Sequence, residues 1–244
     1  MHSDEFRVHA HRFVNWMADY FAGVENYPLV PACKPGDLLK MLPEKAPEFP
    51  EPMEDIFRDF TEMIMPGITH WQHPGWFAYF PANNSPASVL AEMLTATLGV
   101  QGMLWQTSPA ATELEERMMQ WLGQMIGLPP AMQGVIQDTA STATLCALIS
   151  AREKLSGGAV NRSGFYEKMT VYASEEAHSS IEKGVKIAGF GSDNLRRIAT
   201  NESFAMRVEL LENSIQQDIQ NGFKPCCVVA CLGTTSSMAM DPLV

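Results

Sequence analysis

Residues 169–180 read MTVYASEEAHSS, and this stretch decides the predicted fold. The apolar run over 169–173 predicts a buried strand, and the polar turn after it leads through His178 into a helix over 179–188. The alternation continues with a strand over 195–200, a helix over 206–221 and a strongly apolar strand over 226–232. This β-α-β-α-β order predicts a mostly parallel sheet with helices on its faces.

The chain before these strands is predicted to be helical. Residues 4–22 carry an apolar stripe too rich in aromatic rings for a free surface, so the helix needs another surface to pack against. Residues 28–52 are dense in proline and predict an extended connector with one short helix inside it. Further helices are predicted over 53–65, 86–98, 109–127 and 141–155. We therefore expect a helical N-terminal arm over 1–85 and a sheet-bearing domain over 86–244.

Composition excludes several classes of protein. The 244 residues are 46% hydrophobic and 18% charged, which is typical of a globular chain. The formal net charge of −11 argues against a nucleic-acid surface, and no apolar stretch approaches the ~20 residues of a membrane span. The N-terminus lacks a signal-peptide pattern, and the five cysteines suit a reducing compartment. We expect a cytoplasmic protein without a metal site, a nucleic-acid partner or a membrane partner.

Small hydroxyl-bearing residues stand where the helix predicted over 141–155 begins. Residues 139–144 read TASTAT, and free backbone N–H groups, the helix dipole and hydroxyl donors meet at such a point. A phosphate ester needs this combination of donors. The alternative is an ordinary Ser/Thr cap of the helix, and the residues alone do not decide between the two.

Two further polar segments follow predicted strands. His178 comes after the strand over 169–173, and Thr234 and Thr235 come after the strand over 226–232. The carboxyl ends of parallel strands share one edge of the sheet, where open α/β sheets bind ligands. A histidine there can stack on a ring and titrate near neutral pH. The alternatives are a helix-capping or solvent-facing histidine and threonine hydroxyls that satisfy the backbone at the strand end.

An aromatic, proline-punctuated run lies at residues 70–81, HWQHPGWFAYFP, where neither helical nor strand periodicity fits. Its rings predict contact with something flat or apolar, and a buried structural loop is the alternative. His70 and His73 have the spacing of a metal pair on a helix. No helix carries them and no acidic or thiol partner is near, so we reject a metal site there.

Five segments follow this run in order: 83–94 (NNSPASVLAEML), 107–115 (TSPAATELE), 134–144 (GVIQDTASTAT), 177–180 (AHSS) and 232–235 (LGTT). Together they resemble the group II pyridoxal-phosphate-dependent decarboxylases, and within these the aromatic-L-amino-acid decarboxylases. The resemblance runs from about the first helix to the last residue. It implies a fold-type I structure of the aspartate aminotransferase superfamily, with an incomplete large domain. It also implies pyridoxal 5'-phosphate as cofactor and a homodimer whose N-terminal arm wraps around the partner subunit.

The resemblance also assigns residues. Ala140 and Ser141 match the phosphate-contacting positions, His178 the cofactor-stacking and proton-handling residue, and Thr235 a position that faces cofactor or substrate. The positions that line the substrate ring are matched by Trp71, Tyr79, Phe80, Pro81 and Ala82, and those presented across the dimer interface by Gln101 and Met103. Ala82 stands where relatives often have threonine, and the polar Gln101 stands where they present an apolar or aromatic side chain.

The implied reaction is decarboxylation of an aromatic L-amino acid to the amine and CO2. Relatives carry an aspartate for the pyridine nitrogen and a Schiff-base lysine well after the Gly-Thr-Thr segment, whereas this sequence ends at Val244 without either motif. We expect the N-terminal portion of a longer enzyme, inactive alone. The alternatives are an inert or purely interacting fragment and an aldehyde-forming relative. The retained His178 favours plain decarboxylation, because some oxidatively deaminating relatives carry another residue there.

Overall fold

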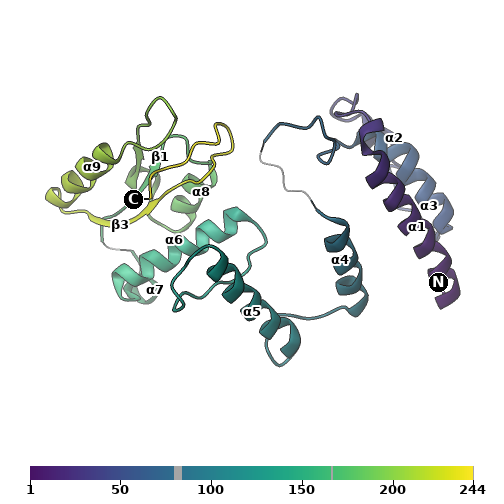
Figure 1. Ribbon diagram of the computed structural model, residues 1–244, viewed down its shortest axis with the longest axis horizontal. Helices are drawn as coiled ribbons and strands as arrows, with labels where there is room; N and C mark the ends of the chain where they lie inside the picture. Colours follow the sequence, from purple (N-terminus) through teal and green to yellow (C-terminus); the bar gives the residue numbers. More distant parts are fainter. Residues whose placement is uncertain (80–83, 166, 244) are drawn as a thin grey trace. The chain divides into compact units, whose positions relative to one another are not determined.

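The computed structural model describes residues 1–79, 84–165 and 167–243, which divide into two compact units, Met1–Val89 and Leu90–Val244. The first unit contains α1 (Ser3–Gly23), α2 (Asp37–Met41) and α3 (Met53–Asp59), and α4 (Pro86–Leu98) begins in it and runs into the second. The second unit continues with α5 (Pro109–Met125), α6 (Ala140–Ser156), α7 (Ala159–Ser163), β1 (Met169–Ser174), α8 (Ser180–Ile187), β2 (Leu195–Ile198), α9 (Val208–Gln220) and β3 (Lys224–Val229) (Figure 1).

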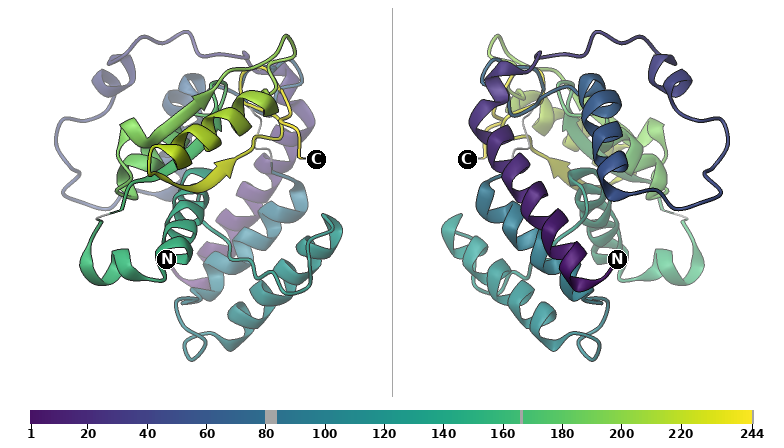
Figure 2. Two further views of the ribbon diagram at one scale, coloured as in Figure 1. Left: turned by 90° about the vertical axis from the view of Figure 1, so that its left-hand side faces the viewer. Right: turned by 90° about the vertical axis from the view of Figure 1, so that its right-hand side faces the viewer.

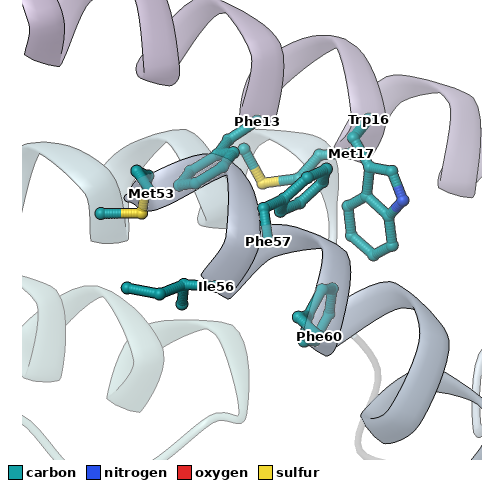
Figure 3. A pocket seen from close by; sticks show the side chains of 7 residues that line it. All are labelled: Phe13, Trp16, Met17, Met53, Ile56, Phe57 and Phe60. Atoms are coloured by element: carbon teal, nitrogen blue, oxygen red, sulfur yellow. The ribbon is translucent and has the colours of Figure 1, made fainter. Parts of the chain in front are cut away.

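Aromatic side chains join α1 to α3 within the first unit. The rings of Phe13 and Phe57 stack with centroids 4.9 Å apart, and Trp16 meets Phe60 edge-on at 5.3 Å. Figure 3 shows these rings between the two helices. A cavity of about 380 Å³ is lined by Phe13, Trp16, Met17, Met53, Ile56, Phe57 and Phe60. The predicted aromatic stripe of the first helix therefore packs partly on α3, although every side chain of α1 keeps some exposure.

The helix predicted over 53–65 is interrupted. The α-helical part ends at Asp59, and the chain continues as a π-helical turn over Phe60–Ile64 and a 3-10 turn over Met65–Gly67. Pro66 has no N–H to continue the helical ladder. The Thr61 hydroxyl donates to the carbonyls of Phe57 at 3.2 Å and Arg58 at 2.8 Å, and so competes for backbone acceptors.

The second unit is built on a parallel sheet with the strand order β2-β1-β3. The central strand β1 is buried along its whole length because it has a neighbour on each side and helices on both faces. Val171 and Met169 pack with side chains of α6 and α8, whereas Tyr172 packs with side chains of α9. Figures 1 and 2 show the ribbons of these helices around the sheet. Opposite faces are expected, since successive residues of a strand alternate. The predicted α/β class with a parallel sheet is confirmed.

One glycine explains how closely α6 and α8 pack. A Cβ placed at Gly184 of α8 would lie 2.9 Å from the Leu148 side chain of α6 and 3.9 Å from the Leu145 backbone. Glycine weakens a helix interior, so its presence here reflects this close approach. Leu148, Val171, Val185 and Phe190 form the buried core on this face.

The last predicted strand is displaced. We expected a buried strand over 226–232, but β3 covers Lys224–Val229, and its residues are at most half-buried. Thr234 and Thr235 therefore lie in a loop after the strand rather than at its end. Asp241 causes this, because it pairs with Cys231 through both its backbone N–H and its carboxylate and turns the chain away from β1. The short helix α7 was not predicted.

The described residues contain neither a membrane-spanning helix nor a cluster of metal-binding side chains. Across residues 1–79, 84–165 and 167–243, none of the helices has the length and apolar character needed to cross a bilayer. The same residues contain no group of three or more His, Cys, Asp or Glu side chains that could hold a metal ion.

Candidate active site

His178 lies four residues after the end of β1, and its ring is held by the next helix. The backbone N–H of Ser180 donates to His178 Nδ1 at 3.2 Å, and the Ser180 hydroxyl lies 2.9 Å from the same nitrogen. Because Nδ1 accepts from a backbone donor, the neutral ring carries its proton on Nε2. The side chain itself is exposed. His178 therefore presents an oriented Nε2–H at the carboxyl end of the sheet.

The loop after β3 reaches the same end of the sheet. The backbone N–H of His178 lies close enough to the Cys231 thiol to act on its pKa. Burial and the nearby Asp241 carboxylate raise the pKa of Cys231, and the His178 N–H opposes that rise. The Asp241 carboxylate accepts from the N–H groups of Cys231 and Met206, each at 2.8 Å. This carboxylate thus fixes Cys231, at the start of the loop that carries Thr234 and Thr235.

The two threonines of this loop differ. Thr234 is buried, its hydroxyl lies 2.6 Å from the Ser237 hydroxyl, and it accepts from the Ala239 N–H at 3.3 Å. The backbone-satisfying alternative is therefore correct for Thr234. Thr235 is only half-buried.

The N-terminus of α6 carries the hydroxyl-rich segment. The Thr139 side chain caps the helix by accepting from the Thr142 N–H at 3.2 Å. Ala140 and Ser141 occupy the first two helical positions, where backbone N–H groups have no acceptor within the helix. The predicted capping role belongs to Thr139, and the donors at Ala140 and Ser141 stay available for an anion.

The direction of α6 decides where these donors point. Arg152 Nη1 donates to the Ala188 carbonyl at the end of α8, and Leu148, one turn earlier, lies against Gly184. The two helices therefore run side by side in the same direction. Their N-termini lie at the same end of the sheet, and α8 begins two residues after His178. The structure thus brings Ser141, His178 and the Thr235 loop to one edge of the sheet.

The aromatic run belongs to the first unit. His70 is buried, its Nδ1 lies 2.9 Å from the Tyr20 hydroxyl, and its ring lies 4.8 Å from that of Tyr27. Beyond this anchor, Trp71 and Tyr79 are 40% and 68% exposed. The run is therefore buried at one end and open at the other. Phe80, Pro81 and Ala82 lie outside the described residues.

Gln101 and Met103 lie on an exposed loop between α4 and α5. The Thr107 hydroxyl organises this loop, since it lies 2.6 Å from the Gln101 carbonyl and 2.9 Å from that of Leu104. The Trp105 indole donates to Glu113 of α5 at 2.9 Å. The sequence did not lead us to predict that Thr107 organises this loop or that Ser180 orients His178. A hydroxyl near a turn is nevertheless a known signal for such hydrogen bonds.

Comparison with known proteins identifies the family. The conserved domain of pyridoxal-dependent decarboxylases matches residues 35–244. The chain belongs to the pyridoxal-dependent decarboxylase family. A phenylacetaldehyde synthase from Arabidopsis thaliana is 41% identical over 251 residues, covering 100% of this chain and 51% of the relative. A tyrosine decarboxylase from Papaver somniferum is 42% identical, covering 98% of this chain and 49% of the relative.

Solved structures agree. Catharanthus roseus tryptophan decarboxylase, in complex with L-tryptophan, matches with a TM-score of 0.92 and 40% identity, over 100% of this chain and 53% of that one. Rhodiola rosea 4-hydroxyphenylacetaldehyde synthase matches with a TM-score of 0.91 and 38% identity over the same shares. The expected family and fold class are confirmed: this is part of the fold of plant aromatic-amino-acid decarboxylases. The chain spans about half the length of these relatives.

The donors of this chain fit one part of the cofactor that the family uses. Free N–H groups and the Ser141 hydroxyl at a helix N-terminus suit a phosphate, and an oriented imidazole suits a flat ring. The exposed Asp138 adds a negative charge just before this helix. The fit covers the phosphate and one ring face.

Proposed function

We propose that this chain is the N-terminal half of a pyridoxal-phosphate-dependent decarboxylase that converts an aromatic L-amino acid into its amine and CO2. One observation supports the proposal: α6 and α8 run side by side in the same direction, and their N-termini lie at the end of the parallel sheet where β1 leads into His178 and β3 into the loop of Thr235. Relatives that are about 40% identical are named as decarboxylases of tyrosine and tryptophan, which supports an aromatic substrate.

Each residue at the edge has a distinct task in this proposal. Ala140 and Ser141 bind the phosphate through backbone N–H groups and a hydroxyl. His178 covers one face of the cofactor ring and holds a proton at Nε2, while Thr235 contacts cofactor or substrate. Bound pyridoxal phosphate supplies an electron sink for the bond that loses CO2. Ser180 orients His178, and Asp241 holds the loop of Thr235.

The aromatic run supplies the selectivity. Trp71, Tyr79, Phe80 and Pro81 are proposed to bind the substrate ring by shape and apolar area. Ala82 removes one hydroxyl from this wall. Gln101 and Met103 complete the pocket of a second subunit in a homodimer.

A second function has a specific observation in its favour. Two relatives in the comparison are named phenylacetaldehyde synthase, and a third, of known structure, is a 4-hydroxyphenylacetaldehyde synthase. An aldehyde-forming enzyme would consume O2, as a two-electron oxidant, and water, and would release the aldehyde, ammonia and hydrogen peroxide in addition to CO2. The retained His178 favours amine formation, and the reaction products separate the two functions.

The test compares this chain with the product of the complete reading frame that contains it. Each protein is incubated with pyridoxal phosphate and one of five substrates: dopa, tyrosine, tryptophan, phenylalanine or histidine. We expect the longer protein to release an amine from at least one aromatic substrate, and this chain alone to release none. Ammonia and aldehyde in place of amine would establish the second function. A longer protein that carries the lysine segment yet releases neither product would refute both.

A further inference from the structure

Three rings gather at the open end of the aromatic run. Trp71, Trp76 and Tyr79, here called the three-ring cluster, lie within nine residues of one another. The Trp71 ring lies 5.3 Å from that of Trp76 and 5.8 Å from that of Tyr79, and Trp76 and Tyr79 are 6.2 Å apart. Each ring therefore touches both others at distances typical of favourable aromatic pairs.

The three rings are not equally exposed. Trp71 and Tyr79 are 40% and 68% exposed, whereas Trp76 is half-buried with its indole nitrogen shielded from solvent. Trp76 is thus the most covered of the three rings, and its ring lies close to both of the others. Two exposed rings supported by a more buried third ring are suited to binding a ligand through the exposed pair.

Tyr79 has an unfavourable backbone. Its φ of +61° lies in the left-handed region, which tyrosine rarely adopts without support from its surroundings. Its ring is nearly parallel to that of Trp71, with an interplanar angle of 10°. Contacts of the ring with Trp71 and Trp76 are the described interactions that can offset this conformation.

Trp76 is itself fixed by a tight turn. Its backbone N–H donates to the His73 carbonyl at 2.9 Å, and the Gly75 N–H donates to His73 Nδ1 at 2.9 Å. His73 in turn bonds through its N–H to the carbonyl of the buried His70. Support therefore passes from the buried anchor through this turn to Trp76, and from Trp76 to the two exposed rings.

We propose that Trp76 is a positioning residue that holds Trp71 and Tyr79 in place and thereby sets the width of the substrate-ring pocket. This inference rests on the proposed function for the identity of the ligand. The positioning itself concerns residues 70–79 and can be tested without catalysis. Trp76 need not touch the substrate, since its effect passes through the two outer rings.

The first experiment uses this chain and limited digestion with chymotrypsin, with cleavage after Phe77 and Tyr79 followed by mass spectrometry. Trp76→Leu removes both ring contacts, so we expect cleavage there to accelerate about tenfold. Trp76→Phe keeps a ring and should stay within about twofold of the parent. Phe204, also exposed and also at positive φ, gives an internal reference whose cleavage rate should not change. Equal rates at Tyr79 in all three proteins would overturn the positioning role.

The second experiment uses the product of the complete reading frame. Trp76→Leu should raise KM for aromatic substrates about tenfold with little change in kcat, and Trp76→Phe should restore KM. Phe77→Leu is the matched control, because Phe77 is 91% exposed and belongs to none of the three ring pairs. Faster cleavage at Tyr79 with an unchanged KM would overturn the link to the pocket. A parent protein that forms no product would refute the proposed function, while the digestion would still decide the role of Trp76.

Discussion

Two helices of the second unit, α8 and α5, each carry an apolar stripe. The stripe of α8 is buried, whereas that of α5 is exposed. Ile181 and Val185 of α8 are buried against α6 and the sheet. The stripe of α5 stays in the open, with Trp121 at 47% and Leu122 at 45% exposure. Within the second unit, the described residues leave this apolar face of α5 exposed. An amphipathic pattern thus predicts which side of a helix needs a partner, and the partner must be found elsewhere.

The contrast between buried and exposed side chains can be measured as a change in the free energy of unfolding. The largest loss is expected for the buried hydrogen-bond network beneath α9. Asp218 accepts from the Tyr172 hydroxyl at 2.7 Å and from Arg196 Nη2 at 2.8 Å. Burial alone would raise the pKa of Asp218, but the hydrogen bonds from Arg196 and Tyr172 lower it overall. Burial also raises the pKa of Tyr172 to about 12. Asp218 is therefore a buried carboxylate whose charged form is stabilised by its hydrogen bonds with Arg196 and Tyr172.

We expect Asp218→Ala to reduce the free energy of unfolding by about 3–5 kcal/mol, because it leaves Arg196 without its buried counter-charge. Urea unfolding followed by circular dichroism measures this. Glu209→Ala breaks the exposed ion pair with Arg207 and serves as the control, for which little change is expected. Equal midpoints for the two variants would show that the network beneath α9 does not stabilise the sheet.

Leu148→Ala tests the packed face directly. Leu148 is 2% exposed and lies against Gly184, so its removal leaves a cavity between α6 and α8. The expected cost is about 2–5 kcal/mol. A loss below about 1 kcal/mol in the same urea titration would mean that α8 is not firmly seated on α6, and the contrast with α5 would disappear.

Sequence predicted the parts of this fold that local signals specify. The helix α6 was predicted over 141–155 with a hydroxyl-rich start, and in the structure Thr139 caps that start and Gly157, with φ of +60°, ends the helix. The short helix α7 was missed because the pair Gly157-Gly158 resembles a simple break. Its single turn depends on Asn161, which bonds to Arg152 and Glu153 of α6. Such contacts cannot be seen in a pattern of residue types.

The candidate site, like the fold, could be predicted only where local sequence signals specify it. His178 and Ser141 were found from their places after a strand and at a helix start. The end of β3 was misplaced because the apolar run continues to Leu232, while Asp241, ten residues after Cys231, removes Cys231 from the ladder. The resemblance supplied the residue roles, which periodicity alone could not.

A smaller effect, and one that depends on pH, is expected at His70 in the first unit. Burial, and to a lesser extent His73, lowers the pKa of His70, whose ring also contacts Tyr20 and Tyr27. The unfolded chain therefore takes up a proton first as the pH falls, so stability is lost below about pH 6.5. His70→Phe should remove this part of the acid sensitivity. Melting temperatures at pH 5 and 7.5 measure it, and an unchanged difference between the two would show that His70 does not titrate against the fold.

The smallest effect is expected for a substitution on α5, which tests the exposed helix of the pair α8 and α5. Leu122→Ala makes the same chemical change as Leu148→Ala, but its side chain is 45% exposed, so it leaves no enclosed cavity. We expect a change within about 0.5 kcal/mol in the free energy of unfolding. If Leu122→Ala instead costs as much as Leu148→Ala, the apolar face of α5 is covered in solution, and exposure in this structure would not describe its environment. Sedimentation of the same two variants would then show whether a second copy provides the cover, because only Leu122→Ala should weaken such an association.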